Sequence, residues 1–467
     1  MKHKFLFILL FSLVLEGMVT TQAVAGDYVH QVNTLIGTKG TGLTSGYLYP
    51  GATYPYGMVQ FTPSYFSKRS GFVINQLSGG GCEHMGNFPT FPVKGKLKMS
   101  PDNILNYRIN VSEEKGHAGY YEAMVQEDIK AKLTVTERTG MASYEYPADQ
   151  QYGTIIIGGG ISATPIEQAA IVITAPNKCE GYAEGGNFCG LRTPYKVYFV
   201  AEFDTDAFET GTWKREELMP NTTFAEGEYS GVYFTFDVNK KKNIQYKIGV
   251  SYVSVENARE NLKAENAEWD FQKIQNQAEA KWNHYLGMIE VEGTNPDRTT
   301  QFYTHLYRSF IHPNVCSDVN GEYMGADFRV HKSRSKHYTS FSNWDTYRTQ
   351  IQLLSMLDPE VASDIVVSHQ LFAEQSGGSF PRWVMANIET GVMQGDPTPI
   401  LIANAYAFGA RNYDPKPIFK IMRKGAEEPG SKSQDVETRP GLKQYLDKGY
   451  YNASIQLEYT SADFAIG

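Results

Sequence analysis

The sequence has no apolar run long enough to span a membrane in an ordinary way. Its most continuous apolar stretch, Phe5 to Leu15, is shorter than the ~20 residues that cross a bilayer. Basic residues are not in excess either, because the formal net charge is −8 and no basic stripe is present. Nucleic acid and anionic membrane surfaces are therefore excluded as expected partners.

The first 25 residues have the parts of a secretory signal peptide instead. Lys2 and Lys4 give a positive start, the apolar run follows, and Ala23 and Ala25 place small residues at the positions that signal peptidase reads. We predict cleavage after Ala25, a periplasmic or secreted protein, and no membrane insertion after cleavage.

Cysteine is also scarce. Only Cys82, Cys179, Cys189 and Cys316 are present, and their spacing matches no zinc motif. Export permits disulfides, and the glycine-rich segment between Cys179 and Cys189 is flexible enough to close a short loop. The sequence suggests this pairing and leaves open whether it forms.

What the chain does have is a change of hydrophobic period. Residues 26–255 alternate apolar and polar positions, as in the runs 195–203, 232–236 and 244–252. Alternation with Gly, Pro and Asn breaks predicts many short strands and a β-sandwich. The 442 residues left after cleavage (467 − 25) are too many for one ordinary core, so we expect two domains.

From residue 256 onward the period is that of helices. Residues 256–286 predict a helical linker, and a brief strand is expected at 289–292. Residues 287–467 predict repeated helices, with an inward face through Phe302, His305, Leu306, Ser309 and Phe310 and further helices at 345–357, 359–372 and 398–409. We interpret this region as an almost wholly helical α/α toroid.

Six motifs occur in one order along the chain. They are Val32–Thr38 with Tyr49–Gln60, Leu77–Cys82, Ser342–Arg348, Gly378–Trp383, Gly395–Pro397 and Gln456–Tyr459. In this order they resemble glycoside hydrolase family 92, the calcium-dependent exo-α-mannosidases of Bacteroidetes type. The resemblance implies a β-sandwich packed on an (α/α)6 toroid, an active site between them, and inverting hydrolysis of terminal α-mannosides in N-glycans or mannan.

Residues of two motifs are suited to holding one terminal sugar. Trp344 offers an aromatic face, Asp345 a carboxylate for paired hydroxyls, and Arg348 a guanidinium that fixes orientation. The pair Arg382 and Trp383 repeats this chemistry. We predict that all five, together with Asp396, bind substrate. The alternative for each tryptophan is core packing.

Glu458 is the candidate general acid, because the resemblance places the family's acid in the Leu-Glu-Tyr motif. Inverting hydrolysis also needs a base, with the two carboxyl groups roughly 6.5–9.5 Å apart. The resemblance implies an Asp in a Gly-Asn-Asp-Asp-type loop that these 467 residues do not contain. We therefore expect only the first part of the toroid here, an inactive fragment as given, and calcium ligands mostly beyond residue 467.

The glycine turn before Cys82 brings backbone close to any ligand. Glu83, His84 and Asn87 after it are candidates for contacting the sugar beyond the cleaved bond, or for a polar loop between domains. His305, His312 and His369 are expected to pack or face solvent rather than bind metal, since no pair has zincin spacing.

Two rival functions stay open. One is another (α/α)6 enzyme, such as a glycoside phosphorylase, which would need a phosphate site that we cannot identify. The other is a non-catalytic carbohydrate-binding fragment. The expected partner in the favoured interpretation is a mannose-containing glycan.

Overall fold

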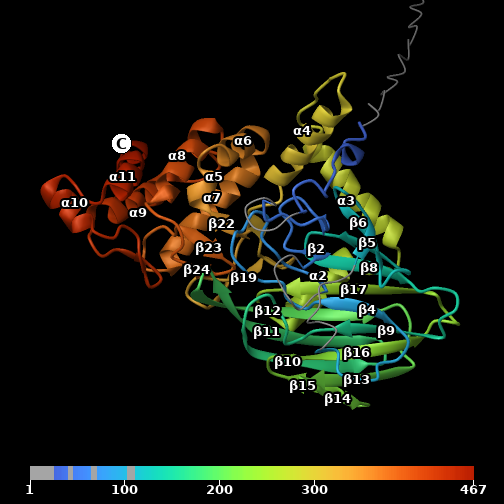
Figure 1. Ribbon diagram of the computed structural model, residues 1–467. Helices are drawn as coiled ribbons and strands as arrows, with labels where there is room; N and C mark the ends of the chain where they lie inside the picture. The colour runs from blue at the N-terminus through green and yellow to red at the C-terminus, as the bar shows by residue number, and fades with distance from the viewer. Residues whose placement is uncertain (1–25, 40–45, 65–70, 103–110) are drawn as a thin grey trace, which may run out of the picture.

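The computed structural model describes residues 26–39, 46–64, 71–102 and 111–467, so the predicted signal peptide lies outside the described residues. A β-rich part is followed along the chain by a helical part, and the two lie side by side (Figure 1). This confirms the predicted class of fold.

Two antiparallel sheets form the β-sandwich. The first has the order β1 (Ala52–Thr53), β2 (Gln60–Pro63), β3 (Phe72–Val73), β4 (Thr90–Lys94), β9 (Tyr152–Ile157), β16 (Ser230–Asp237), β13 (Glu209–Lys214) and β14 (Glu217–Pro220). The second has the order β15 (Phe224–Glu226), β10 (Ile166–Ala175), β11 (Lys178–Phe188), β12 (Leu191–Phe203), β17 (Asn243–Ser251), β8 (Thr139–Glu145), β7 (Ile129–Val135), β6 (Tyr120–Val125) and β5 (Val111–His117). The three alternating runs lie in β12, β16 and β17, as predicted.

Aromatic side chains fill the space between the sheets. Phe203 of β12 lies 4.8 Å from Phe234 of β16 and 5.3 Å from Tyr246 of β17, measured between ring centroids. All three are fully buried, and each such side chain stabilises the fold by about 1.5–3 kcal/mol relative to exposure.

The suggested bridge between Cys179 and Cys189 is wrong. Cys189 pairs with Cys82, and Cys179 is a free, buried thiol. The glycines between Cys179 and Cys189 belong to strand β11 rather than to a flexible loop. A strand rises about 3.3 Å per residue, so the two cysteines lie at opposite ends of an extended segment and cannot meet.

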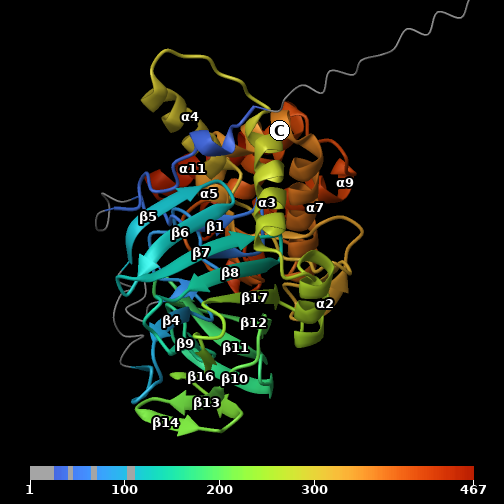
Figure 2. The same cartoon turned by 90° about the vertical axis from the view of Figure 1, so that its right-hand side faces the viewer.

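Two linker helices cover the nine-stranded sheet, α2 (Val255–Glu265) on β17 and β12 and α3 (Phe271–Leu286) on β6 to β8 (Figure 2). Each begins at a capping side chain, because Ser254 accepts the N–H of Asn257 and Asp270 accepts that of Lys273. Trp282 of α3 is fully buried and donates from its indole to the Thr53 carbonyl at 2.7 Å.

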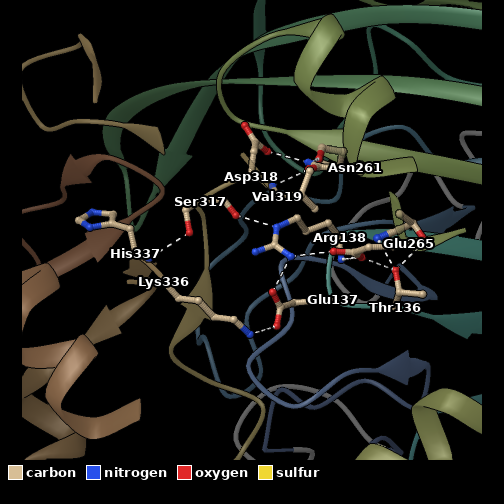
Figure 3. A network of polar contacts seen from close by, with 12 residues as sticks. Thr136, Glu137, Arg138, Asn261, Glu265, Ser317, Asp318, Val319, Lys336 and His337 are labelled. Atoms are coloured by element: carbon tan, nitrogen blue, oxygen red, sulfur yellow. Dashed lines mark hydrogen bonds and ion pairs between the residues drawn. The ribbon is translucent and has the colours of Figure 1, made fainter. Parts of the chain in front are cut away.

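A polar network joins the sandwich, the linker and the helical part around Arg138 (Figure 3). Its guanidinium donates to the Ser317 carbonyl and to Glu265, both at 2.7 Å, and contacts Glu137 at 2.6 Å. The neighbouring Asp318 is buried and accepts hydrogen bonds from Ser251 and from the amides of Asn257 and Asn261. This arrangement fixes how the two parts meet.

The helical part contains eight helices among its described residues: α4 (Pro296–Ser309), α5 (Asn343–Thr346), α6 (Gln350–Leu357), α7 (Pro359–Gln375), α8 (Pro397–Phe408), α9 (Pro415–Glu427), α10 (Leu442–Lys448) and α11 (Ala453–Ile466). The start of the chain shares their core, because Val29, of the 3₁₀ turn η1 (Val29–Gln31), Tyr49 and Tyr56 pack with it. None of the described helices has the length and apolar character that a bilayer span requires.

Three details of the helical prediction are wrong. Residues 289–292 form no strand, and the predicted helix 345–357 is broken into α5 and α6. The inward face of α4 is Tyr303, Leu306, Tyr307 and the following Phe310, whereas His305 is exposed.

The region is also not almost wholly helical, since its loops hold the short strands β18 (Asn314–Val315), β19 (Glu322–Met324), β20 (Val330–Lys332), β21 (Tyr338–Thr339), β22 (Phe341–Ser342), β23 (Trp383–Met385), β24 (Ile388–Glu389), β25 (Lys432–Ser433) and β26 (Val436–Glu437). The sequence could not predict these strands, because a strand of two or three residues is too short to show the alternation of apolar and polar positions.

Candidate active site

A pocket of about 600 Å³ lies where the two parts meet. One side, which we call the sandwich wall, is formed by residues 77–82 with Phe188 and Cys189. The other side, the helical wall, is formed by residues 340–343, Asp345, Thr346, Trp383 and parts of α6 to α8. Its volume suits a small ligand that is held on several sides.

Two histidines hold the sandwich wall in place through hydrogen bonds to its backbone. His84 is fully buried; its Nδ1 donates to the Cys82 carbonyl at 2.7 Å and its Nε2 accepts the N–H of Leu77 at 2.8 Å. From the helical part, His312 accepts the N–H of Ser78 at 2.8 Å. Burial lowers the pKa of His84 and of His312 to about 4, so both are neutral near pH 7.

The other two residues predicted for this wall differ from each other. Glu83 is exposed. Asn87 is buried, exchanges hydrogen bonds with Asn75 and accepts the Tyr195 hydroxyl at 2.5 Å. Neither lines the pocket, so their contact with a sugar remains a prediction.

Trp344, Arg348 and Glu458 come together next to the helical wall, although none of the three is among the residues that line the pocket. Trp344 lies in α5, just after strand β22, and donates from its indole Nε1 to Glu458 Oε1 at 3.0 Å. The Arg348 guanidinium lies 4.2 Å from the centre of the Trp344 ring. Asp345 lines the pocket and accepts the Ser342 hydroxyl. Sequence alone placed these groups in one site, although 114 positions separate Trp344 from Glu458.

Arg382 and Trp383 diverge. Trp383 lines the pocket and packs against Phe188 of the opposite wall, with ring centroids 4.4 Å apart. The Arg382 guanidinium instead donates to the carbonyls of Met393 at 3.0 Å and Glu437 at 2.9 Å. These bonds join two loops behind the wall.

Asp396 is buried in an ion pair. Arg439 donates from Nε to Asp396 at 2.9 Å and from Nη1 to Asp463 at 2.6 Å. Burial raises the pKa of Asp396, against the pull of the Arg439 charge. Asp396 therefore positions α8 against α11, the helix that carries Glu458, and its predicted contact with substrate remains untested.

Sequence reasoning missed several pocket residues. Arg308, His312, Asn343 and Gln350 line the pocket, and Arg308 also donates to the carbonyls of Tyr49 and Thr34. Of these four, only Asn343 had a sequence signal for a place in the pocket, because it lies inside the Ser342–Arg348 motif. His369 lines the pocket too; it is buried and stacks on Phe341, as expected for a packing histidine.

The residues described here do not assemble a calcium site. Calcium takes six to eight oxygen ligands, whereas the one carboxylate that lines the pocket among them is Asp345. The one cluster of three metal-ligating side chains found in those residues, His30, His117 and Glu279, is rich in nitrogen. We therefore derive no step of the chemistry through calcium.

A β-sandwich packed against helices, with an aromatic and carboxylate-bearing pocket where they meet, defines a two-domain architecture whose pocket suits a small ligand. The chain belongs to glycosyl hydrolase family 92: the family's N-terminal domain matches residues 31–251 and its catalytic domain matches residues 257–467.

Solved structures of family 92 mannosidases are similar to this chain. The family 92 α-mannosidase BT3965 of Bacteroides thetaiotaomicron is 25% identical with a TM-score of 0.83, over 94% of this chain and 62% of that one. The inverting mannosidase BT2199 of the same organism, 24% identical over 94% of this chain and 62% of that one, has a TM-score of 0.81 and shows the same fold.

An uncharacterized secreted glycosidase of Arthroderma benhamiae is 24% identical over 98% of this chain and 62% of its own length. The chain thus spans about three fifths of the length of these relatives.

Proposed function

We propose that the protein is an exported, inverting exo-α-mannosidase that removes terminal α-mannose from N-glycans or mannan. Membership of family 92 and the likeness to an α-mannosidase support this; one structure of that mannosidase holds mannoimidazole. The description of the fungal relative as secreted supports export.

The observation that carries the proposal is the contact between Trp344 and Glu458 beside the pocket. Glu458 does not itself line the pocket, but its partner Trp344 lies in the sequence between Asn343 and Asp345, which do. A carboxyl group beside a bound sugar can protonate a leaving oxygen. An indole N–H at 3.0 Å fixes which way that carboxyl points. In this assignment Glu458 is the general acid, and Asp345, Arg348 and Trp344 hold the terminal sugar.

The base and the calcium ion are assigned from the family alone. We propose that the base is a carboxylate, and we assign no residue of this chain to it or to calcium. When bound, calcium would hold vicinal hydroxyls of the sugar and ease ring distortion.

Release of free mannose by the full-length protein tests the proposal. Mannose released as the sugar, in a reaction that chelation abolishes and calcium restores, supports it. Release of mannose 1-phosphate only in the presence of phosphate would indicate a phosphorylase. Binding of the glycan without turnover would indicate a carbohydrate-binding protein.

A further inference from the structure

Away from the pocket, the start of the mature chain meets the linker helix beside the edge of the nine-stranded sheet. His30 in η1, His117 at the end of β5 and Glu279 in α3 each present one ligand atom, and these atoms lie within 4.8 Å of one another. They come from three segments that are far apart in the sequence. The cluster is not part of the pocket lining.

We propose that His30, His117 and Glu279 form a binding site for a zinc-class divalent cation. Two imidazoles and one carboxylate with a fourth position open to water are a ligand set that zinc uses in proteins. The proposal is independent of the mannosidase activity. It is also distinct from the family's calcium, because calcium prefers oxygen ligands.

The distances fit an ion after a small adjustment. His117 Nε2 and Glu279 Oε1 are 2.8 Å apart, and ligand atoms on a tetrahedral zinc ion with bonds of 2.0–2.1 Å lie about 3.3 Å apart. His30 has to close the larger gap. Its side chain is 55% exposed and its ring already lies 4.6 Å from that of His117, so little packing opposes the movement.

Outer partners orient the ligands, as metal sites require. Asp27 accepts from His30 Nδ1 at 2.6 Å, which leaves Nε2 as the ligand atom. Gln275 donates to Glu279 at 2.6 Å, and Tyr120 stacks on the His117 ring.

A bound ion would link η1, which holds His30, to α3 and to strand β5 of the sheet. The segment is already positioned, because Asn283 of α3 accepts the N–H groups of Tyr28 and Val29. A cation would add three coordinate bonds at the same junction. Because it binds the folded state alone, it raises the melting temperature as its concentration rises.

The test uses the mature protein with Zn²⁺ alone, followed by calorimetry and thermal unfolding, and with Co²⁺ as a spectroscopic probe. We expect one equivalent of Zn²⁺ to bind, a rise in Tm that chelation reverses, and the visible absorption bands of four-coordinate Co²⁺. Excess Ca²⁺ should not displace the ion.

His117→Gln and Glu279→Gln should each weaken binding at least about tenfold, the size of effect that loss of an outer partner alone produces. The matched control is His331→Gln, which removes a histidine paired with Asp327 but belonging to no such cluster. Equal Zn²⁺ affinity in the wild-type protein and the His117 variant, or no binding at all, would overturn the proposal. The Co²⁺ spectrum of the wild-type protein decides the matter even if a variant fails to fold.

Discussion

The two walls of the pocket are stabilised in different ways. The sandwich wall contains the disulfide between Cys82 and Cys189, and both ring nitrogens of His84 form hydrogen bonds with its backbone. Beside the helical wall, Trp344 and Glu458 are half-buried and are joined by one hydrogen bond. Under the proposed function, the sandwich wall shapes the pocket and the groups beside the helical wall perform the chemistry.

Removing the carboxyl group of Glu458 should have the largest effect. In the full-length enzyme we expect Glu458→Gln to reduce turnover of glycans about 10²–10⁴-fold, since a positioned general acid contributes that much. The loss should be smaller on an aryl mannoside whose leaving group needs no proton. Glu428→Gln, at an exposed site after α9, is the matched control. Equal losses on both substrates would make Glu458 a binding or structural residue.

On the sandwich wall the corresponding change is loss of the disulfide. The bridge joins residues 107 positions apart, and closing a loop of about 100 residues is worth about 4.7 kcal/mol in the chain-entropy model. We expect the double substitution of Cys82 and Cys189 by Ser to lower the free energy of unfolding by about that amount, measured by denaturation.

Cys179→Ala is the control for this change, because it removes a buried thiol and leaves the bridge intact. A count of free thiols in the unfolded protein should fall to one in this variant. A variant of Cys82 and Cys189 as stable as the parent would remove the structural contrast between the walls.

Sequence predicted the parts of the molecule in which a long pattern repeats. The strands of the sandwich and helices α2, α3, α7 and α8 follow from periodicity, because their hydrophobic faces decide their packing. Glycines misled the interpretation once: those of β11 allow close strand packing, since a Cβ at Gly181 would meet the Ala170 carbonyl at 2.2 Å. Composition could not distinguish that role from a flexible loop.

The candidate site was predictable by residue type but not by contact. The group of Trp344, Arg348 and Glu458 was expected from motifs and does come together. Arg382 and Asp396 were expected from the same kind of motif, yet their polar atoms are directed at backbone carbonyls and at Arg439. A motif records that a residue matters near a site; only the packing around it shows what it touches.

Trp344→Phe tests whether activity depends on the hydrogen bond from the Trp344 indole to Glu458. The ring face remains, but Glu458 loses the indole donor that would stabilise the carboxylate formed when the acid gives up its proton, and a hydrogen bond to a charged group is worth about 1.5–3 kcal/mol. We therefore expect kcat to fall about 10- to 100-fold with little change in KM. In a background that already carries Glu458→Gln, the same substitution should cost far less, because the two act as a unit. Additive losses would show that Trp344 acts on the sugar alone.

The last prediction concerns the pH dependence of stability and tests the burial of His84 behind the sandwich wall. Burial lowers the pKa of His84 to about 4 from its ordinary value of 6.5. The unfolded state therefore binds the proton first as pH falls. The stabilisation is fully present above pH 6.5 and is lost progressively as pH falls toward 4. One such proton gives a slope of about 1.4 kcal/mol per pH unit in the free energy of unfolding.

Replacing His84 by Gln should flatten that slope by about one proton between pH 4.5 and 6, measured by chemical denaturation at a series of pH values. An amide can still donate to the Cys82 carbonyl and accept the Leu77 N–H, so the variant keeps a brace for the turn. His305→Gln, which removes an exposed histidine of α4, serves as the matched control. His312 should contribute a second proton of the same sign, because its pKa is lowered to about 4 by the same burial. If the His84 variant and the parent lose stability in parallel, the imidazole is not buried in its neutral form.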